Sequence, residues 1–261
     1  MNQTALKQIR IVLVEPAGPL NVGAIARVMK NMGLSQLAIV NPQCDIMADD
    51  AKKMAVHARE ILETASIEAD LPAALQGCLR AIATTGRTRS LPTNFETPRH
   101  ALPWLLEAPS ALIFGREDRG LSNEELKYAQ RFVRIPSCEE YSSLNLAQAV
   151  AVCCAELYQS AIGPAVASPE ASDRAVSAET AVHPPASQIR DSASLDESEG
   201  YYQHLEKLLL EIGYLYPHTA ASRMEKFRRL YNRAQLSSQE VAMLRGILRQ
   251  IEWALSHQIR S

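Results

Sequence analysis

Short apolar runs alternate with amphipathic segments between Arg10 and Ile162. Five of these runs are too short for helices and too apolar for strands that are half exposed to water. They are the predicted strands Ile11–Val14, Leu37–Val40, Leu79–Ala83, Ala111–Phe114 and Phe132–Ile135. The segments between them predict helices over Val22–Met32, Asn123–Gln130 and Leu144–Ser160. Apolar strands that alternate with helices are typical of a parallel sheet covered on both faces, so we expect an α/β domain.

The pattern is lost after Gly163 and returns at Tyr201. The segment between contains four prolines, many Ala and Ser and no aromatic residue, which is too little apolar surface to offset the cost of ordering it. Three apolar stripes then predict three helices: Tyr201, Leu205, Leu208, Leu209, Ile212; Met224, Phe227, Leu230, Tyr231; Val241, Leu244, Leu248, Ile251, Leu255. We expect an α/β domain over 1–162, a flexible acidic linker over 163–199 and a small helical domain over 200–261.

Charge changes this picture because the near-neutral total hides a partition. The 261 residues carry a net charge of −2 and are 47% hydrophobic, which excludes a uniformly basic nucleic-acid coat and a disordered acidic chain. Residues 1–160 have a net charge of −1, residues 161–199 of −5 and residues 200–261 of +4. The positive charge is therefore concentrated at the C-terminal end.

The cellular compartment is suggested by what the sequence lacks. Met1–Arg10 has no apolar signal core, and no run approaches the ~18 apolar residues of a membrane span. Five cysteines without a CxxC pair predict buried thiols, with no disulfide and no metal site. We expect a soluble cytoplasmic protein that has no contact with membranes.

Loops after the strands are the candidate binding regions, because ligands of open α/β sheets bind beyond the carboxyl ends of strands. The first loop, PAGPLNVGAIARVMKNMG, lacks G-x-G-x-x-G, which excludes an ordinary Rossmann nucleotide site. It places Asn21 at a helix start and Arg27 less than two turns later. A helix cap and a solvated charge are the alternative interpretations of these two residues.

Two further loops combine glycine or small polar residues with charge. In IFGREDRGLSNEEL, residues 113–126, glycines on both sides of four charges suggest backbone close to a ligand, although a tight turn would look the same. In IPSCEEYSSLNLAQAVAV, residues 135–152, Ser142, Ser143 and Asn145 supply more polar groups than capping one helix needs. A small polar ligand at that helix start would use the surplus.

Basic residues outside these loops form two groups. Arg87 and Arg89 lie close together in TTGRTRSLP, residues 84–92. A second group would form a helix face opposite Met224, Phe227 and Leu230; it comprises Arg223, Lys226, Arg228, Arg229 and Arg233. Solvated surface charge and contacts with RNA phosphates both fit these groups.

Together and in this order, the motifs resemble those of the SpoU branch of the SPOUT RNA methyltransferases. The matching stretches are NVGAIAR (21–27), FGREDRGLSNEEL (114–126) and IPSCEEYSSLNLAQAV (135–150). Within that branch, VEPAGPLNVGAIARVMKNMGLSQLAIVNP (14–42), TGRTRSLP (85–92) and the tail are similar to the tRNA 2′-O-methyltransferases. The tail stretches are YYQHLEKLLLEIG (201–213), KFRRLYNRA (226–234) and MLRGILRQIEW (243–253). The tail is the more informative part, because the three motifs alone would also fit ribosomal-RNA relatives.

This resemblance implies a mainly parallel sheet with helices on both faces, whose C-terminal part forms a deep trefoil knot. It implies S-adenosylmethionine as cofactor, held by the backbone of three loops, and a homodimer with the active site near the subunit interface. The implied substrate is the ribose of a cytidine or uridine at position 32 in the anticodon loop of tRNA. A ribosomal-RNA 2′-O-methyltransferase and a non-catalytic RNA-binding factor with the same fold are the alternatives.

The resemblance also assigns site residues. The cofactor pocket would comprise Thr84, Thr85, Gly86, Gly115, Ile135, Ser142, Ser143 and Leu144. The catalytic positions would be Arg27, Asn21, Glu117, Ser143 and Asn145, and tRNA would contact Arg89 and the five C-terminal basic residues. Arg27 is the family's proposed activator of the ribose hydroxyl. Because a guanidinium normally keeps its charge, we favour a role in orienting the ribose or a phosphate.

Overall fold

The computed structural model describes residues 3–86, 95–141, 143–163 and 192–258. Among these residues six strands form one parallel sheet in the order β3-β2-β1-β5-β4-β6. The strands are β1 (Ile9–Val14), β2 (Gln36–Val40), β3 (Ser66–Glu68), β4 (Arg80–Thr84), β5 (Ser110–Phe114) and β6 (Arg131–Val133). The predicted α/β domain with an all-parallel sheet is thereby confirmed.

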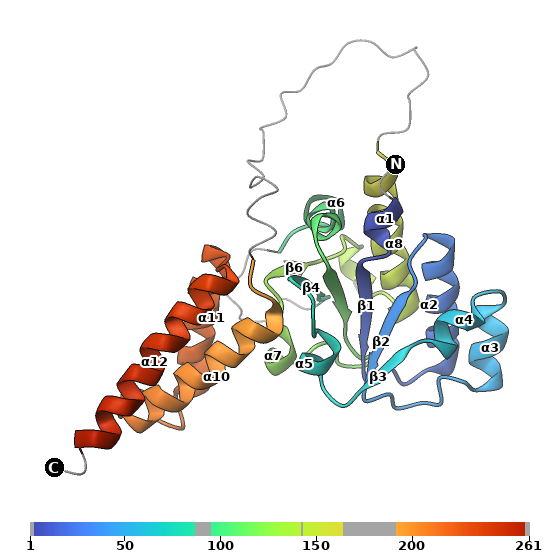
Figure 1. Ribbon diagram of the computed structural model, residues 1–261. Helices are drawn as coiled ribbons and strands as arrows, with labels where there is room; N and C mark the ends of the chain where they lie inside the picture. The colour runs from blue at the N-terminus through green and yellow to red at the C-terminus, as the bar shows by residue number, and fades with distance from the viewer. Residues whose placement is uncertain (1–2, 87–94, 142, 164–191, 259–261) are drawn as a thin grey trace.

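Helices cover both faces of the sheet (Figure 1). In the α/β domain they are α1 (Gln3–Leu6), α2 (Pro19–Asn31), α3 (Asp49–Ala55), α4 (Arg59–Glu63), α5 (Leu71–Ala74), α6 (Pro98–Ala101), α7 (Asn123–Leu126) and α8 (Leu146–Ile162). Two short 3₁₀ helices, η1 (Leu102–Glu107) and η2 (Glu139–Tyr141), complete it. The cores follow the alternation of strand β1: Ile11 and Leu13 face the cluster under α2 and α8, and Val12 faces the cluster on the other side.

The predicted elements differ from the observed ones where polar contacts intervene. Strand β3 was not predicted, because its three residues are largely exposed at the sheet edge and do not form an apolar run. Helix α7 ends at Leu126 and does not extend to Gln130. The Gln130 side chain accepts from the Ala81 N–H at 2.8 Å and donates to the Leu79 carbonyl at 3.2 Å. These bonds tie the chain to β4 in place of a further helical turn.

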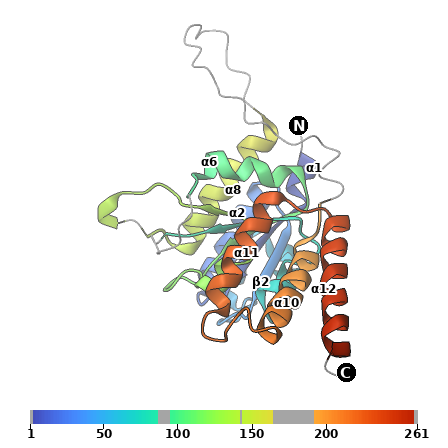
Figure 2. The same cartoon turned by 90° about the vertical axis from the view of Figure 1, so that its left-hand side faces the viewer.

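The C-terminal region is a bundle of three helices (Figure 2). They are α10 (Leu195–Glu211), α11 (Ala220–Ala234) and α12 (Ser238–Gln258). A capping box of Ser194 and Glu197 starts α10 at Leu195, so the last five residues of the predicted linker lie in this helix. Its core holds Tyr201, which packs edge to face on Tyr231 at 5.3 Å between ring centroids. Residues 164–191 of the predicted linker lie outside the described residues.

Three predicted core positions of the bundle are exposed. Ile212, directly after α10, is 46% exposed, Leu230 of α11 is 50% exposed and Ile251 of α12 is 39% exposed. Arg228, which we assigned to the solvated face, is instead buried in α11. The buried face of α11 is therefore rotated about the helix axis relative to the predicted apolar face. It includes Arg228, because Glu199 of α10 lies opposite Arg228 and pairs with it.

Helix α10 also fixes the bundle against the α/β domain. The Leu195 N–H donates to the Cys78 carbonyl at 2.8 Å, and the Gly77 N–H donates to Asp196 Oδ1 at 3.2 Å. Tyr128 of the α/β domain lies 5.8 Å from the guanidinium of Arg228, whose other ring neighbour is Tyr202 at 4.5 Å. A few polar and cation–π contacts thus connect the two domains.

The predicted buried thiols hold for three of the five cysteines. Cys78, Cys153 and Cys154 are buried, and burial raises the pKa of the Cys153 thiol to about 12. Cys44 is half-buried and Cys138 is exposed, contrary to the prediction. None of the helices in the described part of the chain is both long and apolar enough to cross a membrane.

Candidate active site

The three motif loops meet beyond the carboxyl ends of the parallel strands, as the sheet topology requires. Glu117, in the loop after β5, joins the first two loops. Its carboxylate accepts from the backbone N–H of Ala17 at 3.0 Å and of Gly18 at 3.2 Å, and from Asn21 Nδ2 at 3.0 Å. The start of α2 is therefore attached directly to the second motif loop.

Asn21 extends the connection to the third loop. Its Oδ1 accepts from Asn145 Nδ2 at 3.0 Å, and Asn145 Oδ1 in turn accepts from the Ala147 N–H at 2.8 Å as the cap of α8. One carboxylate and two amides thus form a continuous chain from residue 117 to residue 145. Amide and carboxylate groups arranged in this way fix one another's orientation.

The electrostatics of Glu117 favour an ionised carboxylate at neutral pH. Partial burial pushes its pKa upward, but the hydrogen bonds from Asn21, Ala17 and Gly18 outweigh burial and hold the pKa below its usual value. Since its oxygens already accept three hydrogen bonds, Glu117 is poorly suited to remove a proton. Its position favours a role in holding the loops and whatever binds to them.

A cavity of about 300 Å³ opens beside this chain. It is lined by Thr84, Thr85, Gly86, Phe114, Gly115, Arg116, Glu117, Asp118, Gly120, Val133, Ile135, Ser143, Leu144, Leu146 and Ala149. Its walls combine backbone, apolar side chains and a few polar groups, as in sites for small cofactors. The loops after β4, β5 and β6 all contribute to it.

Gly115 shows why the wall of this cavity is made of backbone. A Cβ atom at Gly115 would lie 2.3 Å from Gly120 C and 2.3 Å from Leu121 N. Residues 115 and 120 therefore approach more closely than any side chain would allow. The absence of a side chain at Gly115 therefore permits the shape of this part of the cavity.

An ion-pair network lies behind the loop after β5 and was not predicted from the sequence. Arg119 binds Glu15 Oε2 at 2.9 Å and Glu125 Oε1 at 2.9 Å, and Glu15 has a backbone φ of 50° at the end of β1. Hydrogen bonds to Glu125 and Glu15 raise the pKa of Arg119, so its guanidinium stays protonated. The four charges after Gly115 signalled a special loop, but their partners come from distant positions that spacing does not reveal.

The structure brings most of the predicted cofactor residues together. Thr84, Thr85, Gly86, Gly115, Ile135, Ser143 and Leu144 all line the one cavity, and Ser142 lies outside the described residues. Of the predicted catalytic residues, Glu117 and Ser143 also line it, while Asn21 and Asn145 are linked to Glu117.

Arg27 is the predicted catalytic residue that the structure does not bring to the cavity. It is exposed on α2, and within the described ranges it has no hydrogen-bond or ion-pair partner. Its side chain is therefore available to a partner beyond this single chain.

The predicted RNA-contacting residues divide into three groups. Arg223, Lys226 and Arg233 are exposed on α11, and Arg229 is half-buried and paired with Glu225 at 2.6 Å. Arg89 lies outside the described residues. The prediction for Arg228 is wrong, because its guanidinium is buried and donates to both oxygens of Glu199, with Nη2–Oε1 at 2.9 Å. A phosphate could not reach it without breaking that pair.

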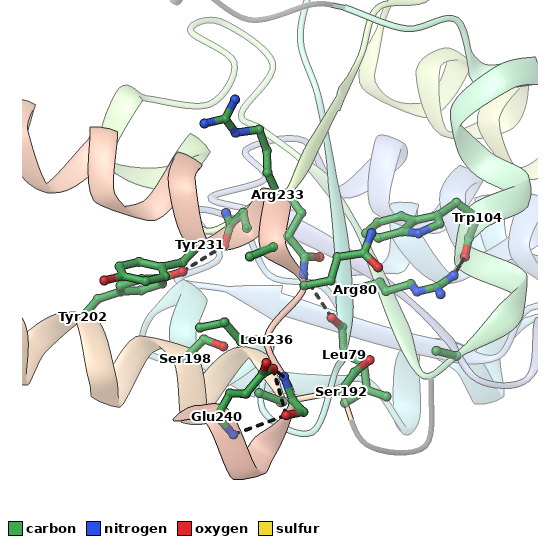
Figure 3. A pocket seen from close by; sticks show the side chains of 17 residues that line it. Leu79, Arg80, Trp104, Ser192, Ser198, Tyr202, Tyr231, Arg233, Leu236 and Glu240 are labelled. Atoms are coloured by element: carbon green, nitrogen blue, oxygen red, sulfur yellow. Dashed lines mark hydrogen bonds between the residues drawn. The ribbon is translucent and has the colours of Figure 1, made fainter. Parts of the chain in front are cut away.

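A larger cavity, of about 430 Å³, lies between the two domains, with Tyr202, Tyr231 and Arg233 facing Arg80 and Trp104 (Figure 3). Its polar groups are mostly used within the protein. Arg80 donates to Glu107 at 2.7 Å, and Tyr202 donates to Asn232 at 3.0 Å. Because few of its polar groups are left for a ligand, we do not assign chemistry to this cavity.

The model of the SpoU rRNA Methylase family matches residues 8–155, which include the parallel sheet and the cavity at its carboxyl edge. The α/β domain is therefore a methyltransferase domain of the SpoU class. A second model, the tRNA methyltransferase TrmJ, C-terminal domain, matches residues 196–260.

Individual relatives match along nearly the whole chain. The tRNA (cytidine/uridine/adenosine-2′-O-)-methyltransferase TrmJ of Pseudomonas aeruginosa is 40% identical over 248 residues, covering 93% of each chain. The tRNA (cytidine/uridine-2′-O-)-methyltransferase TrmJ of Klebsiella pneumoniae is 40% identical and covers 95% of this chain and 97% of its own. The crystal structure of TrmJ from Z. mobilis ZM4 superposes with a TM-score of 0.77 and 28% identity, covering 93% and 98% of the two chains. The chain belongs to the TrmJ family of SpoU-type methyltransferases.

Proposed function

We propose that this protein transfers a methyl group from S-adenosylmethionine to the 2′-hydroxyl of a ribose in tRNA, at a cytidine or uridine in position 32 of the anticodon loop. The TrmJ relatives support tRNA as the substrate and the ribose oxygen as the acceptor. The single observation that carries the chemistry is the chain from Glu117 through Asn21 to Asn145 beside the cavity. It connects the loops that would hold the cofactor to the start of α2.

The cavity fits the cofactor by its chemistry. S-adenosylmethionine combines a planar base with charged ends, and the cavity combines apolar residues such as Leu144 with polar ones such as Thr84. The close backbone approach at Gly115 leaves room where side chains would fill it. When bound, the cofactor supplies an activated methyl group, so the protein's task is to align the ribose oxygen and to let its proton leave.

The polar chain assists by holding positions and not by taking protons. Glu117 stays ionised and accepts three hydrogen bonds, which fixes the first motif loop against the cavity. Asn145 caps α8 and holds Asn21, while Ser143 lies on the cavity wall. Such fixed groups reduce the reorganisation needed when the hydroxyl reacts.

Arg27 would act from a second subunit. Its side chain is exposed on α2 and has no partner among the residues that the structure describes, and Leu20 nearby is 52% exposed; both support a homodimer that buries this face. In that dimer the guanidinium would orient the ribose or a neighbouring phosphate, since it keeps its charge and offers a planar fork of donors. The active site would then be complete only in the dimer.

The helical domain would bind the tRNA. Arg223, Lys226 and Arg233 are exposed on α11, and half-buried Arg229 lies on the same helix. These four residues would contact tRNA phosphates together with Arg89. The acidic segment before this domain, with a net charge of −5 over residues 161–199, would be repelled by RNA, and the domain would bind RNA with this face.

The decisive experiment is nucleoside mapping of tRNA and of ribosomal RNA, each incubated with the protein and labelled S-adenosylmethionine. We expect 2′-O-methylcytidine or 2′-O-methyluridine at position 32. Label in ribosomal RNA alone would establish the ribosomal alternative, and no label in any RNA would establish a non-catalytic binding factor. A protein lacking residues 192–261 should keep its cofactor affinity and bind tRNA less tightly.

A further inference from the structure

We infer that the far end of the helical domain carries a stacking site for unpaired bases of the RNA substrate, built from Tyr214, Tyr216 and Trp253. This inference rests on the proposed function and extends it, since it names side chains that would hold bases as well as phosphates. The site lies outside every position that the motifs single out.

The turn between α10 and α11 presents two tyrosines to solvent on a firmly held backbone. Tyr214 and Tyr216 are 52% and 56% exposed, whereas Leu215 between them is 2% exposed and anchors the turn in the core. The Leu215 N–H donates to the Leu209 carbonyl at 2.9 Å, and the Ala220 N–H donates to the Tyr216 carbonyl at 2.9 Å. Both rings are thus held outward at little further entropic cost.

Positively charged and imidazole groups accompany the rings. The Arg223 guanidinium lies 5.7 Å from the centroid of the Tyr214 ring, and its Nη1 donates to the Tyr214 carbonyl at 3.4 Å. The His218 ring stacks on Tyr216 at 6.0 Å with an interplanar angle of 24°. Aromatic rings beside cations are the pattern by which proteins bind single-stranded nucleic acid, with bases on the rings and phosphates on the cations.

Trp253 brings a third ring to the same end. Helices α10 and α12 run in the same direction, because Glu197 accepts from the Ser238 hydroxyl at 2.9 Å near the start of both helices. Further along, His204 and Lys207 of α10 contact Glu252 of α12 at 3.1 Å and 3.6 Å. The end of α12 therefore lies beside the end of α10, at the end of the bundle remote from the sheet (Figures 1 and 2). Trp253 is 55% exposed and stacks on His257 at 4.3 Å.

The concentration of these rings is unusual for this chain. Aromatic residues make up only 5% of the sequence. Among the described residues, the exposed aromatic side chains are Tyr141 and the three at this end of the bundle. Tyr214, Tyr216 and Trp253 lie in the segment with a net charge of +4, residues 200–261, so the charge favours a polyanion over an acidic or neutral partner.

The length of α10 determines which nucleotides the site could hold. Its 17 residues span about 25 Å, so the rings lie about that far from the start of α10 on the α/β domain. The bases stacked here would therefore be other than the nucleotide that is methylated. The inference is that one RNA molecule is held at two separated places.

Binding of bulk tRNA to the full-length protein tests the site, with affinity measured over a series of salt concentrations. The double variant Tyr214→Ala, Tyr216→Ala and the single variant Trp253→Ala should each bind at least about fivefold more weakly. Because stacking releases no counterions, the slope of log K against log salt should stay that of the wild type. The control variant Tyr214→Phe, Tyr216→Phe keeps both rings and should bind as the wild type does.

Each outcome decides the inference. Alanine variants that bind tRNA within twofold of the wild type would overturn it, and so would a change in the salt slope instead of an offset. A change in oligomeric state on sedimentation, without a change in RNA affinity, would overturn it in favour of a contact between two copies of the chain. Failure of the proposed function is distinguishable, since the wild-type protein would then transfer no methyl group to tRNA. All the substituted side chains are more than half exposed, so the variants should fold.

Discussion

The α/β domain and the helical domain are stabilised in different ways. The sheet is packed on both faces by two apolar clusters, and its polar groups are gathered at one edge, where hydrogen bonds tie three loops together. The helical bundle has one small cluster and buries an ion pair, Arg228 with Glu199, inside it. One domain fixes its polar groups for chemistry, while the other uses a polar pair as part of its core.

The difference shows how charge should be interpreted in each domain. Starting the helical domain at Leu195 adds Asp196, Glu197 and Glu199, so its nine basic groups face eight acidic ones and the net charge falls to +1. These three acids all serve the start of α10, as partners of Gly77, Ser194 and Arg228. The excess of positive charge is therefore carried by residues 200–261, beyond the start of α10.

Breaking the buried ion pair should have the largest effect. Arg228→Ala leaves the Glu199 carboxylate buried and unpaired, so we expect a loss of about 3–5 kcal/mol in the stability of the bundle. Thermal unfolding followed by circular dichroism measures it, and cofactor binding by calorimetry should be unchanged. The double variant Arg228→Met, Glu199→Leu should recover most of the loss. A stable Arg228→Ala protein with weakened RNA binding would return Arg228 to the RNA-contacting face.

Removing Arg27 should have the next largest effect, on turnover alone. Arg27→Ala should lower methyl transfer by roughly a hundredfold or more, because removing one fixed hydrogen-bond donor beside the reacting group typically lowers the rate by that factor. Cofactor affinity should stay nearly that of the wild type, since Arg27 does not line the cavity. Loss of cofactor binding in calorimetry would contradict this role. Mixing Arg27→Ala subunits with subunits defective in the cavity should restore part of the activity if the site spans a dimer.

Substitution of Gly115 tests whether the loop backbone shapes the cavity. In Gly115→Ala the new Cβ would collide with backbone atoms of Gly120 and Leu121, so the loop must move at a cost of about 1–3 kcal/mol. We expect cofactor affinity to fall about tenfold or more in calorimetry. Gly86→Ala is the matched control, because Gly86 lines the same cavity and no described atom lies within 4 Å of its added Cβ. Equal affinities of the two variants would refute the account of Gly115.

Glu117 should contribute to stability in a way that depends on pH. Its folded-state pKa is lowered by the hydrogen bonds it accepts, so its contribution is present above its ordinary pKa of about 4.3 and is lost as pH falls through the lowered value. Glu117→Gln should cost about 1–2 kcal/mol near pH 7. The difference in Tm between wild type and variant should shrink as the pH falls below about 4. A difference that is constant from pH 7 to pH 3 would argue against an ionised Glu117.

Local pattern was sufficient for much of the α/β domain. Strands β1, β2, β4 and β5 are buried on both faces, so each is a continuous apolar run. Such a run can be predicted as a strand from its own sequence, without knowledge of its neighbours in the sheet. Local sequence also singled out Gly115 and the several polar residues at the start of α8 as candidate site positions. The trefoil knot came from resemblance alone and stays a prediction, because no local signal encodes threading.

Pairing between distant residues was beyond the reach of the pattern. Arg228 has the spacing of a surface charge, and only the position of Glu199 on another helix makes it a core residue. Glu15 and Arg119 are 104 residues apart, so nothing in either segment indicates their contact. The sequence pattern therefore located the candidate site but could not identify the partners that hold it.

Lys226 should show the smallest effect, and the most specific one. It is exposed on α11 without an ion-pair partner within the described part of the chain, whereas neighbouring Arg229 is paired with Glu225 at 2.6 Å. Lys226→Ala should reduce the slope of log K against log salt for tRNA by about 1, with unchanged stability and unchanged cofactor affinity. Arg229→Ala should reduce the slope less, because its charge is already partly neutralised in the free protein. If both variants keep the wild-type slope, α11 does not lie along the phosphates, and the far-end rings would have to hold the RNA without it.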